Sequence, residues 1–130
     1  MPQTGLGIAL KILRERRKFS LREVSLNSFI DHAYVYRLET GEKTNPSHEL
    51  IDKLLATYKP SERDVDILKW LVDHPETDPK LVEFVIKNDT IDIDVFYMAA
   101  GIRHRGIARP DPATLIARIR RALEEDDEDD

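Results

Sequence analysis

The chain has no cysteine among its 130 residues, which excludes disulfide bonds and thiolate metal sites. Its N-terminus lacks the apolar run of a secretory signal. Its longest apolar stretches also fall far short of the roughly 20 residues that span a bilayer. We therefore expect a soluble protein of the cytoplasm that has no association with a membrane.

Patterns typical of enzymes are also missing. The four histidines, at positions 32, 48, 74 and 104, lack the H-E-x-x-H spacing of a metal site, and there is no glycine-rich phosphate loop. Asp92 and Asp94 are expected on opposite sides of a helix start, which makes them poor general acid and base partners. The sequence thus predicts no catalytic residue, no metal site and no cofactor.

No segment alternates apolar and polar residues over the length of a strand, whereas apolar residues recur at helical spacing throughout. The 41% hydrophobic content can supply the core of one domain, with or without a small appendage. We predict an all-α fold with helices over about residues 6–18, 21–27, 31–40, 47–58, 61–73, 78–87, 92–100 and 112–124.

The charge is divided unequally along the chain. Residues 1–60 carry ten Lys and Arg against seven Asp and Glu, whereas residues 61–130 carry ten against eighteen. The net charge of −5 therefore conceals a basic N-terminal half that can approach phosphates. The last seven residues, Glu124 to Asp130, are all acidic, and we expect a solvated tail because like charges repel.

Capping signals frame two short helices between Ser20 and Gly41. Ser20 and Glu23 have the spacing of a capping box, in which each side chain satisfies a free backbone N–H at a helix start. Asp31 is the expected N-cap of the next helix, and Gly41 is the stop signal after it. The stretch predicts two helices joined by a tight turn.

The N-terminal part resembles the lambda-repressor and Cro family of helix-turn-helix domains, also called the XRE family. The resemblance rests on the leucines, Lys11 and Arg14 of the first helix, on SLREV from Ser20, on IDHAYVYRLE-x-G from Ile30, and on NPS before the fourth helix. It covers roughly residues 6–73. It implies a five-helix DNA-binding domain whose recognition helix is residues 31–40, and whose residues 21–27 cross the DNA backbone.

The resemblance also implies which residues contact DNA. Base edges in the major groove would be read by side chains on the outward face of the recognition helix. Phosphates would be bound at the start of the second helix and in the loop after Gly41. The implied DNA-binding residues are Ser20, Leu21, Arg22, Asp31, His32, Ala33, Tyr36, Arg37, Lys43, Thr44 and Asn45.

Each of these assignments has a simpler alternative. Arg37 is otherwise a solvated helix arginine, His32 an exposed histidine without a role, and Tyr36 a packing residue. Arg14 and Glu39 are different, because the family pairs an arginine and a glutamate at these positions between helices. We expect this pair to be structural.

Three positions depart from the family pattern. Phe29 replaces the glycine of the turn, and a bulky residue in a left-handed conformation costs on the order of 1 kcal/mol. Ser25 replaces the usual alanine, and the loop after Gly41 has a single lysine. We expect Phe29 to be tucked against the junction of the two helices with the turn altered locally. A Phe29 that projects into solvent would instead favour partner binding by that surface.

The predicted organisation has three parts: a helix-turn-helix domain over residues 1–74, a helical region for dimerisation or partner binding over 75–123, and a disordered acidic tail over 124–130. Apolar residues of the second part, together with Trp70 just before it, exceed what short helices need for themselves, and they either form a dimer interface or extend the domain's own core. These residues are Trp70, Leu81, Phe84, Val85, Val95, Phe96 and Met98.

Two segments keep several interpretations. The loop from Arg103 to Arg109 contains three arginines and either contacts phosphate, binds an acidic partner, folds against the acidic tail, or is simply solvated. The tail either competes with DNA for the basic half or only aids solubility.

The sequence therefore predicts a sequence-specific transcriptional regulator, a repressor, that binds a double-stranded DNA operator as a homodimer. The alternative is an antitoxin-like interaction protein whose C-terminal region binds a partner protein, such as a toxin or a peptidase, and which also represses its own operon.

Overall fold

The computed structural model describes residues 3–102 and 109–128 of the chain. The described residues form eight α-helices and no strand, so the predicted all-α fold class is confirmed. The helices are α1 (Gly5–Arg16), α2 (Leu21–Ser28), α3 (His32–Thr40), α4 (His48–Tyr58), α5 (Glu62–Asp73), α6 (Pro79–Lys87), α7 (Ile93–Gly101) and α8 (Pro112–Glu128). Of the arginine-rich loop, only Arg109 is described; residues 103–108 lie outside the described residues, as do 1–2 and 129–130.

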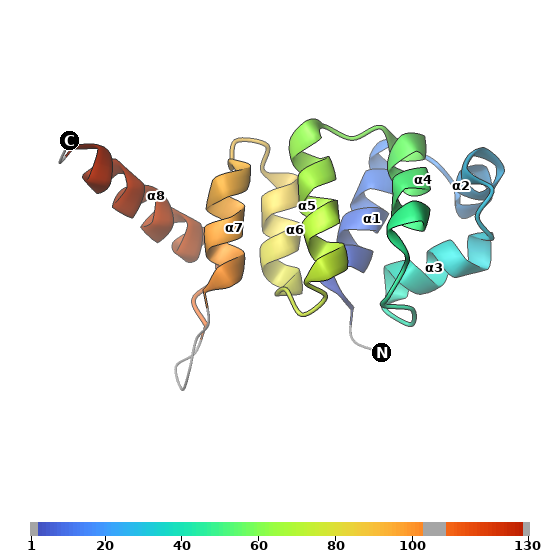
Figure 1. Ribbon diagram of the computed structural model, residues 1–130, viewed down its shortest axis with the longest axis horizontal. Coiled ribbons are helices and arrows are strands. Elements are labelled where there is room, and N and C mark those ends of the chain that lie inside the picture. Colours follow the sequence, from blue (N-terminus) through green and yellow to red (C-terminus); the bar gives the residue numbers. More distant parts are fainter. Residues whose placement is uncertain (1–2, 103–108, 129–130) are drawn as a thin grey trace.

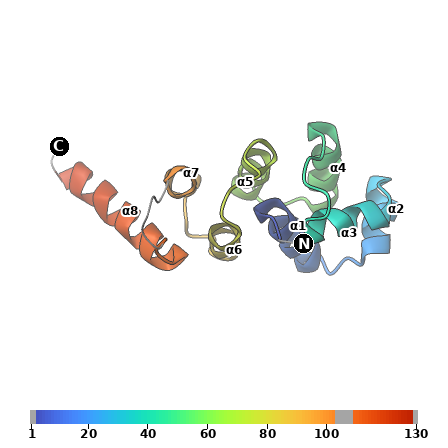
Figure 2. The same cartoon turned by 90° about the horizontal axis from the view of Figure 1, so that it is seen from below.

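The helices follow one another along an elongated molecule (Figure 1). Helices α2 and α3 lie at one end, α1, α4, α5, α6 and α7 occupy the middle, and α8 projects from the other end. The view from below in Figure 2 shows the same order, with α2 and the C-terminal end of α8 furthest apart. The two ends of the molecule therefore carry different helices of the same chain.

Most of the helices begin at a polar side chain that accepts a hydrogen bond from a backbone N–H of the first turn. The caps of this kind are Thr4, Ser20, Asp31, Ser47, Ser61 and Asp78. At α2 the reciprocal contact is also present, because the Glu23 carboxylate accepts from the Ser20 N–H at 3.1 Å. The predicted capping box is thus confirmed.

One continuous hydrophobic core runs from α1 to α8. Helix α6 packs directly on α1, so the C-terminal helices cover an apolar face of the first helix. Of the apolar residues considered for a dimer interface, Leu81, Val85, Val95 and Phe96 are buried, and Trp70 and Phe84 are half-buried against the same core. Only Met98 remains substantially exposed, at 45%. These residues therefore extend the core of the chain itself.

Gly7 allows α1 and α3 to lie unusually close. A Cβ atom at this position would lie 2.5 Å from the carbonyl oxygen of Leu38 and 2.8 Å from that of Glu39. Both neighbours are backbone atoms that cannot turn aside as a flexible side chain could. Gly7 thus fixes the distance between the helix that anchors the core and the helix that the sequence predicts to read DNA.

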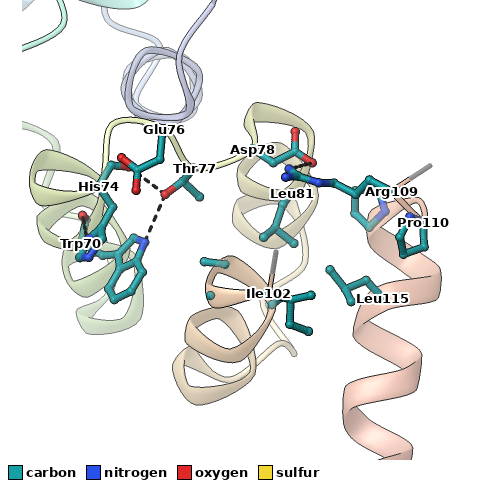
Figure 3. Close-up of a pocket in the computed structure, with 14 residues that line it drawn as sticks. Trp70, His74, Glu76, Thr77, Asp78, Leu81, Ile102, Arg109, Pro110 and Leu115 are labelled. Carbon is teal, nitrogen blue, oxygen red and sulfur yellow. Dashed lines mark hydrogen bonds and ion pairs between the residues drawn. The ribbon is translucent and has the colours of Figure 1, made fainter. Parts of the chain in front are cut away.

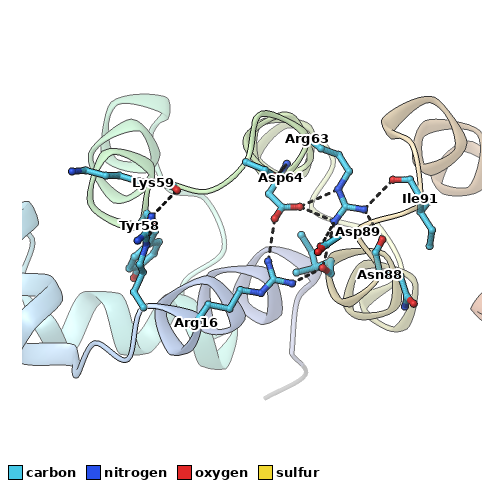
Figure 4. Close-up of polar contacts among 11 residues, drawn as sticks. Arg16, Tyr58, Lys59, Arg63, Asp64, Asn88, Asp89 and Ile91 are labelled. Carbon is cyan, nitrogen blue, oxygen red and sulfur yellow. Dashed lines mark hydrogen bonds and ion pairs between the residues drawn. The ribbon is translucent and has the colours of Figure 1, made fainter.

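Partly buried polar contacts join the N-terminal helices to the helices that follow (Figure 4). Asp64, only 3% exposed, accepts hydrogen bonds from Arg16 at 3.1 Å and from Arg63 at 2.8 Å. Arg16 also donates to the carbonyl of Ile86 at 2.6 Å, and Arg63 to that of Ile91 at 2.9 Å. Two arginines from α1 and α5 therefore hold the end of α6 and the segment that precedes α7.

Two helix ends differ from the expected ones by two residues or more. Helix α1 ends at Arg16 rather than Lys18, because Lys18 takes a left-handed backbone with φ of 58°. Helix α8 continues to Glu128, four residues beyond the expected end at Glu124. Glutamate has a high helix propensity, and Glu124 and Glu125 follow Arg120 and Arg121 at a spacing of four, which favours helical pairing.

Candidate nucleic-acid interface

Helices α2 and α3 are held by one buried face each. Val24 of α2, Ile30 of the turn, and Val35 and Leu38 of α3 are all buried. The Asp31 carboxylate caps α3 by accepting from the Ala33 N–H at 2.8 Å, and Gly41 ends it with φ of 87°. A rigid helix pair thus presents its opposite faces to solvent.

The outward face of α3 carries the predicted base-reading side chains. His32, Tyr36 and Arg37 are exposed, and Ala33 is half-buried. Tyr36 is 54% exposed, so packing does not explain this residue. Among the described residues, the one ion pair of Arg37 is a long one with Glu42, whose Oε2 lies 3.8 Å from the Arg37 Nε. The guanidinium is therefore available to another acceptor.

The predicted phosphate-binding positions differ in what they can still offer. The Ser20 hydroxyl is already used as the cap of α2, where it accepts from the Glu23 N–H at 3.1 Å, and Leu21 is half-buried. Arg22 is exposed, as are Lys43, Thr44 and Asn45 in the loop after α3. Within the described residues neither Arg22 nor Lys43 takes part in an ion pair. Both cations are free to meet an anion.

Arg14 and Glu39 form a two-point ion pair between α1 and α3. Arg14 Nε donates to Glu39 Oε2 at 2.7 Å, and its Nη2 donates to Oε1 at 2.9 Å. A further bond from Arg14 Nη1 to the carbonyl of Phe19 fixes the start of α2. The hydrogen bond to Glu39 raises the pKa of Arg14. The pair thus positions α3 from its inner side and leaves the outer face unobstructed.

Phe29 does not lie where we expected. Its side chain is 92% exposed, so the expectation that it is tucked against the helix junction is wrong. The turn keeps the ordinary left-handed geometry, with φ of 62° and ψ of 26°, and Phe29 adopts it in place of glycine. The local conformation is imposed by the buried residues on both sides, Ser28 and Ile30, which leave the phenyl ring outside.

Residues 6–68 match the family model described as "Helix-turn-helix domain". This stretch of the chain is therefore similar to the helix-turn-helix family. Over 52 residues the chain is 29% identical to the HTH-type transcriptional regulator SlrR of Bacillus subtilis (strain 168). The aligned stretch covers 40% of this chain and 34% of that protein. The match thus spans about a third of the length of the relative. The predicted resemblance to XRE-type domains is confirmed.

A hollow lies outside the helix-turn-helix domain, between α5, α6, α7 and the start of α8 (Figure 3). The Trp70 indole N–H donates to the Thr77 hydroxyl at 3.3 Å, and the His74 ring stacks on the indole with centroids 3.6 Å apart. Arg109 Nη1 lies 3.3 Å from the Asp78 carboxylate. The polar groups named here are already paired with one another, so the hollow offers no evident chemistry.

Neither metal binding nor membrane insertion has support in residues 3–102 and 109–128. No group of three or more histidine and acidic side chains there is arranged to hold a metal ion. No helix there is both long enough and apolar enough to cross a bilayer.

Sequence reasoning missed the residues that support the site from behind. Gly7 lies in an ordinary helical pattern that gives no sign of its close contact with α3. Arg16 binds Asp64, which is 48 residues away in the sequence. Tyr58 is 1% exposed, and its hydroxyl has no hydrogen-bond partner among the described residues. Burial, together with the nearby Glu39 carboxylate, raises the pKa of Tyr58. The only signal in the sequence for these supporting residues was the glycine at position 7, in the first helix.

Proposed function

We propose that this protein is a sequence-specific DNA-binding transcriptional regulator in the cytoplasm and that α3 enters the major groove of its operator. The observation that supports this most strongly is the division of α3 into two faces. The inner face is fixed by Val35, Leu38 and the Arg14–Glu39 pair, and the outer face offers His32 and Arg37. An α-helix fits the major groove, where each base pair has a distinct pattern of donors and acceptors.

Arg37 is the proposed main base contact. A guanidinium can donate two parallel hydrogen bonds to O6 and N7 of guanine, for roughly 1–3 kcal/mol of discrimination against another base. Its competing contact with Glu42 is long and half-exposed, so little free energy is lost when it is released. Ala33, near the start of α3, can contact a thymine methyl group, and His32 and Tyr36 flank the same face.

Phosphate contacts would set the position of the domain on the duplex. Arg22 on α2, and Lys43, Thr44 and Asn45 after α3, lie on either side of the recognition helix in sequence and are all exposed. Only two of these four carry a positive charge, so affinity for a single site should be modest. Each neutralised phosphate contributes a slope of about −0.9 to the dependence of log affinity on log salt.

Modest affinity per domain favours a homodimer on two half-sites, separated by one helical turn of about 34 Å or a multiple of it. When one subunit binds its half-site, the other is held near the second half-site at a high effective concentration, so the dimer binds DNA more tightly than one domain does. We further propose that the protein represses transcription, because a dimer bound at an operator obstructs other proteins from the same DNA.

The test is binding to the DNA upstream of its own gene, measured by fluorescence anisotropy at several salt concentrations. The wild type should prefer this DNA over a scrambled duplex, and Arg37→Ala should lose about tenfold of that preference, corresponding to 1.4 kcal/mol. Arg118→Ala is the matched control, because Arg118 is an exposed helix arginine on α8. Equal, weak binding of the wild type and Arg37→Ala to any duplex would refute the assignment of Arg37 as a base contact.

A further inference from the structure

Three apolar residues, Phe19, Phe29 and Ala56, lie together beside the turn between α2 and α3, and the exposed Leu26 lies on α2 three residues before Phe29. We call this surface the turn patch; it consists of Phe19, Leu26, Phe29 and Ala56. Phe29 is 92% and Leu26 77% exposed, far more than any other large apolar residue of the described chain. Ala56 is exposed and Phe19 half-buried. Apolar surface of this kind on a soluble domain is typical of an interaction site.

The turn patch borders a shallow hollow that carries positive charge. The hollow is lined by Phe19, Phe29 and Ala56 from the turn patch, and also by Lys53 and Lys59 of α4 and its cap. No carboxylate is among its lining residues. The occupant that fits such a surface combines acidic side chains with some apolar surface.

Backbone strain gathers at the same place. Three described residues other than glycine have a positive φ: Lys18, Phe29 and Lys59. Phe29 and Lys59 line the hollow, and Lys18 precedes Phe19, which lines it too. Residues in such conformations cost free energy and tend to cluster at functional surfaces. Phe29 and Lys59 are the C-caps of α2 and α4, so both helices end at this surface.

The chain itself carries a segment of matching chemistry. The last turns of α8 expose Glu124, Glu125 and Asp126, next to the half-buried Leu123. We call these three acids and Leu123 the acidic end of α8. Acidic side chains at the C-terminus of a helix oppose its dipole, so cations nearby would stabilise this helix end. It lies at the opposite end of the molecule from the turn patch and cannot reach it within one copy (Figures 1 and 2).

We propose that the turn patch binds the acidic end of α8 from a second copy of this chain. Lys53 and Lys59 pair with the acids, and Phe29 and Leu26 cover the apolar side of the helix end. Two copies that lie antiparallel make this contact twice, which closes the pair with two-fold symmetry. The contact goes beyond the proposed DNA reading, since it requires no nucleic acid.

The experiment measures self-association of the full chain by sedimentation velocity, without DNA, over a wide range of protein concentration. The wild type should form a dimer that weakens as salt rises, because the contact is partly ionic. The double variants Lys53→Glu/Lys59→Glu and Glu124→Lys/Glu125→Lys should each raise the dimer dissociation constant at least about tenfold, because each places like charges together. The variant that carries all four changes should recover most of the affinity.

Two further variants separate this contact from general effects. Phe29→Gly keeps the left-handed turn but removes the ring, and should weaken the dimer. Lys69→Glu/Lys80→Glu makes the same change in net charge at exposed positions of α5 and α6, and should leave the dimer unchanged. Circular dichroism melts confirm that every variant is folded.

The proposal is overturned if the wild type stays monomeric at all concentrations, or if a dimer forms that neither charge reversal weakens. It is also overturned if the four-change variant fails to recover, as expected when two turn patches bind each other or when the acids act elsewhere. Because no DNA is present, loss of this contact is distinguishable from failure of the proposed DNA binding.

Discussion

Phe29 occupies a backbone conformation that glycine adopts without steric cost, and its ring contributes almost no burial in the isolated chain. A left-handed backbone costs a residue with a Cβ roughly 1–2 kcal/mol. We therefore predict that Phe29→Gly raises the free energy of unfolding by about 1 kcal/mol, after the greater flexibility of the unfolded glycine chain is allowed for. Urea unfolding measures it.

Phe29→Ala is the control for this substitution, because alanine removes the ring but keeps the Cβ and its strain. It should be no more stable than the wild type. A glycine variant that is no more stable than the alanine variant would show that the turn is not strained.

Because the Tyr58 hydroxyl is buried, we predict that the free energy of unfolding depends on pH in the alkaline range. Burial raises the pKa of Tyr58 above its ordinary 10.0. The folded chain therefore keeps this proton at a pH where the unfolded chain has lost it, and the stability contribution, fully present below pH 10, is lost as pH rises beyond it. Tyr58→Phe should show a smaller loss of stability between pH 9 and pH 11 in urea unfolding.

At neutral pH the same substitution should leave stability unchanged or raise it by up to about 1 kcal/mol, because it removes a buried hydroxyl without a partner. Tyr36→Phe, at an exposed position, controls for tyrosine ionisation in general. If the two variants show the same alkaline loss as the wild type, burial of the Tyr58 hydroxyl does not set its pKa.

At the scale of elements, the carboxylate of Asp64 accepts hydrogen bonds from Arg16 of α1 and from Arg63 of α5, and Arg63 also donates to the carbonyl of Asn88 between α6 and α7 (Figure 4). Asp64→Ala leaves Arg63, whose side chain is only 15% exposed, without its ion-pair partner in the buried network. We predict a loss of about 3 kcal/mol in the free energy of unfolding, as for other broken buried ion pairs. Urea unfolding followed by Trp70 fluorescence measures the loss.

Asp66→Ala, two residues along the same helix, is the matched control, because Asp66 has no ion pair among the described residues. It should cost less than about 0.5 kcal/mol. Similar losses for both variants would mean that the network does not hold these elements together.

The elements that were predictable from sequence are those determined by local signals. Ser20 with Glu23, Asp31 and Gly41 marked the ends of α2 and α3 correctly, because caps and stops act within a few residues. The position of Phe29 was not predictable, since burial of its neighbours outweighs its own cost. The partners of Arg16 were not predictable either, because they lie 48 and 70 residues away.

At the scale of the whole molecule, the helices after α5 belong to the same core as the helix-turn-helix domain. A Cβ on Gly5 of α1 would lie 2.7 Å from Val82 Cγ2 of α6, and the carbonyl of Ile86 accepts a hydrogen bond from Arg16. We predict that a fragment of residues 1–74 is less stable than the full chain by at least about 3 kcal/mol in the free energy of unfolding. The reason is that the fragment lacks the apolar side chains of α6 that pack against α1.

Circular dichroism and urea unfolding of the fragment and the full chain check this prediction. A fragment that unfolds cooperatively at the same urea concentration as the full chain would show that the two parts fold independently. The result also decides whether DNA binding can be studied on the N-terminal part alone.

The most direct test of the proposed DNA reading is selection of duplexes from a random-sequence library by the purified full chain. The wild type should enrich one sequence motif that contains a conserved guanine, and Arg37→Ala should enrich a motif relaxed at that guanine while Arg118→Ala enriches the wild-type motif. A wild type that enriches no sequence over the starting library would contradict base reading by α3.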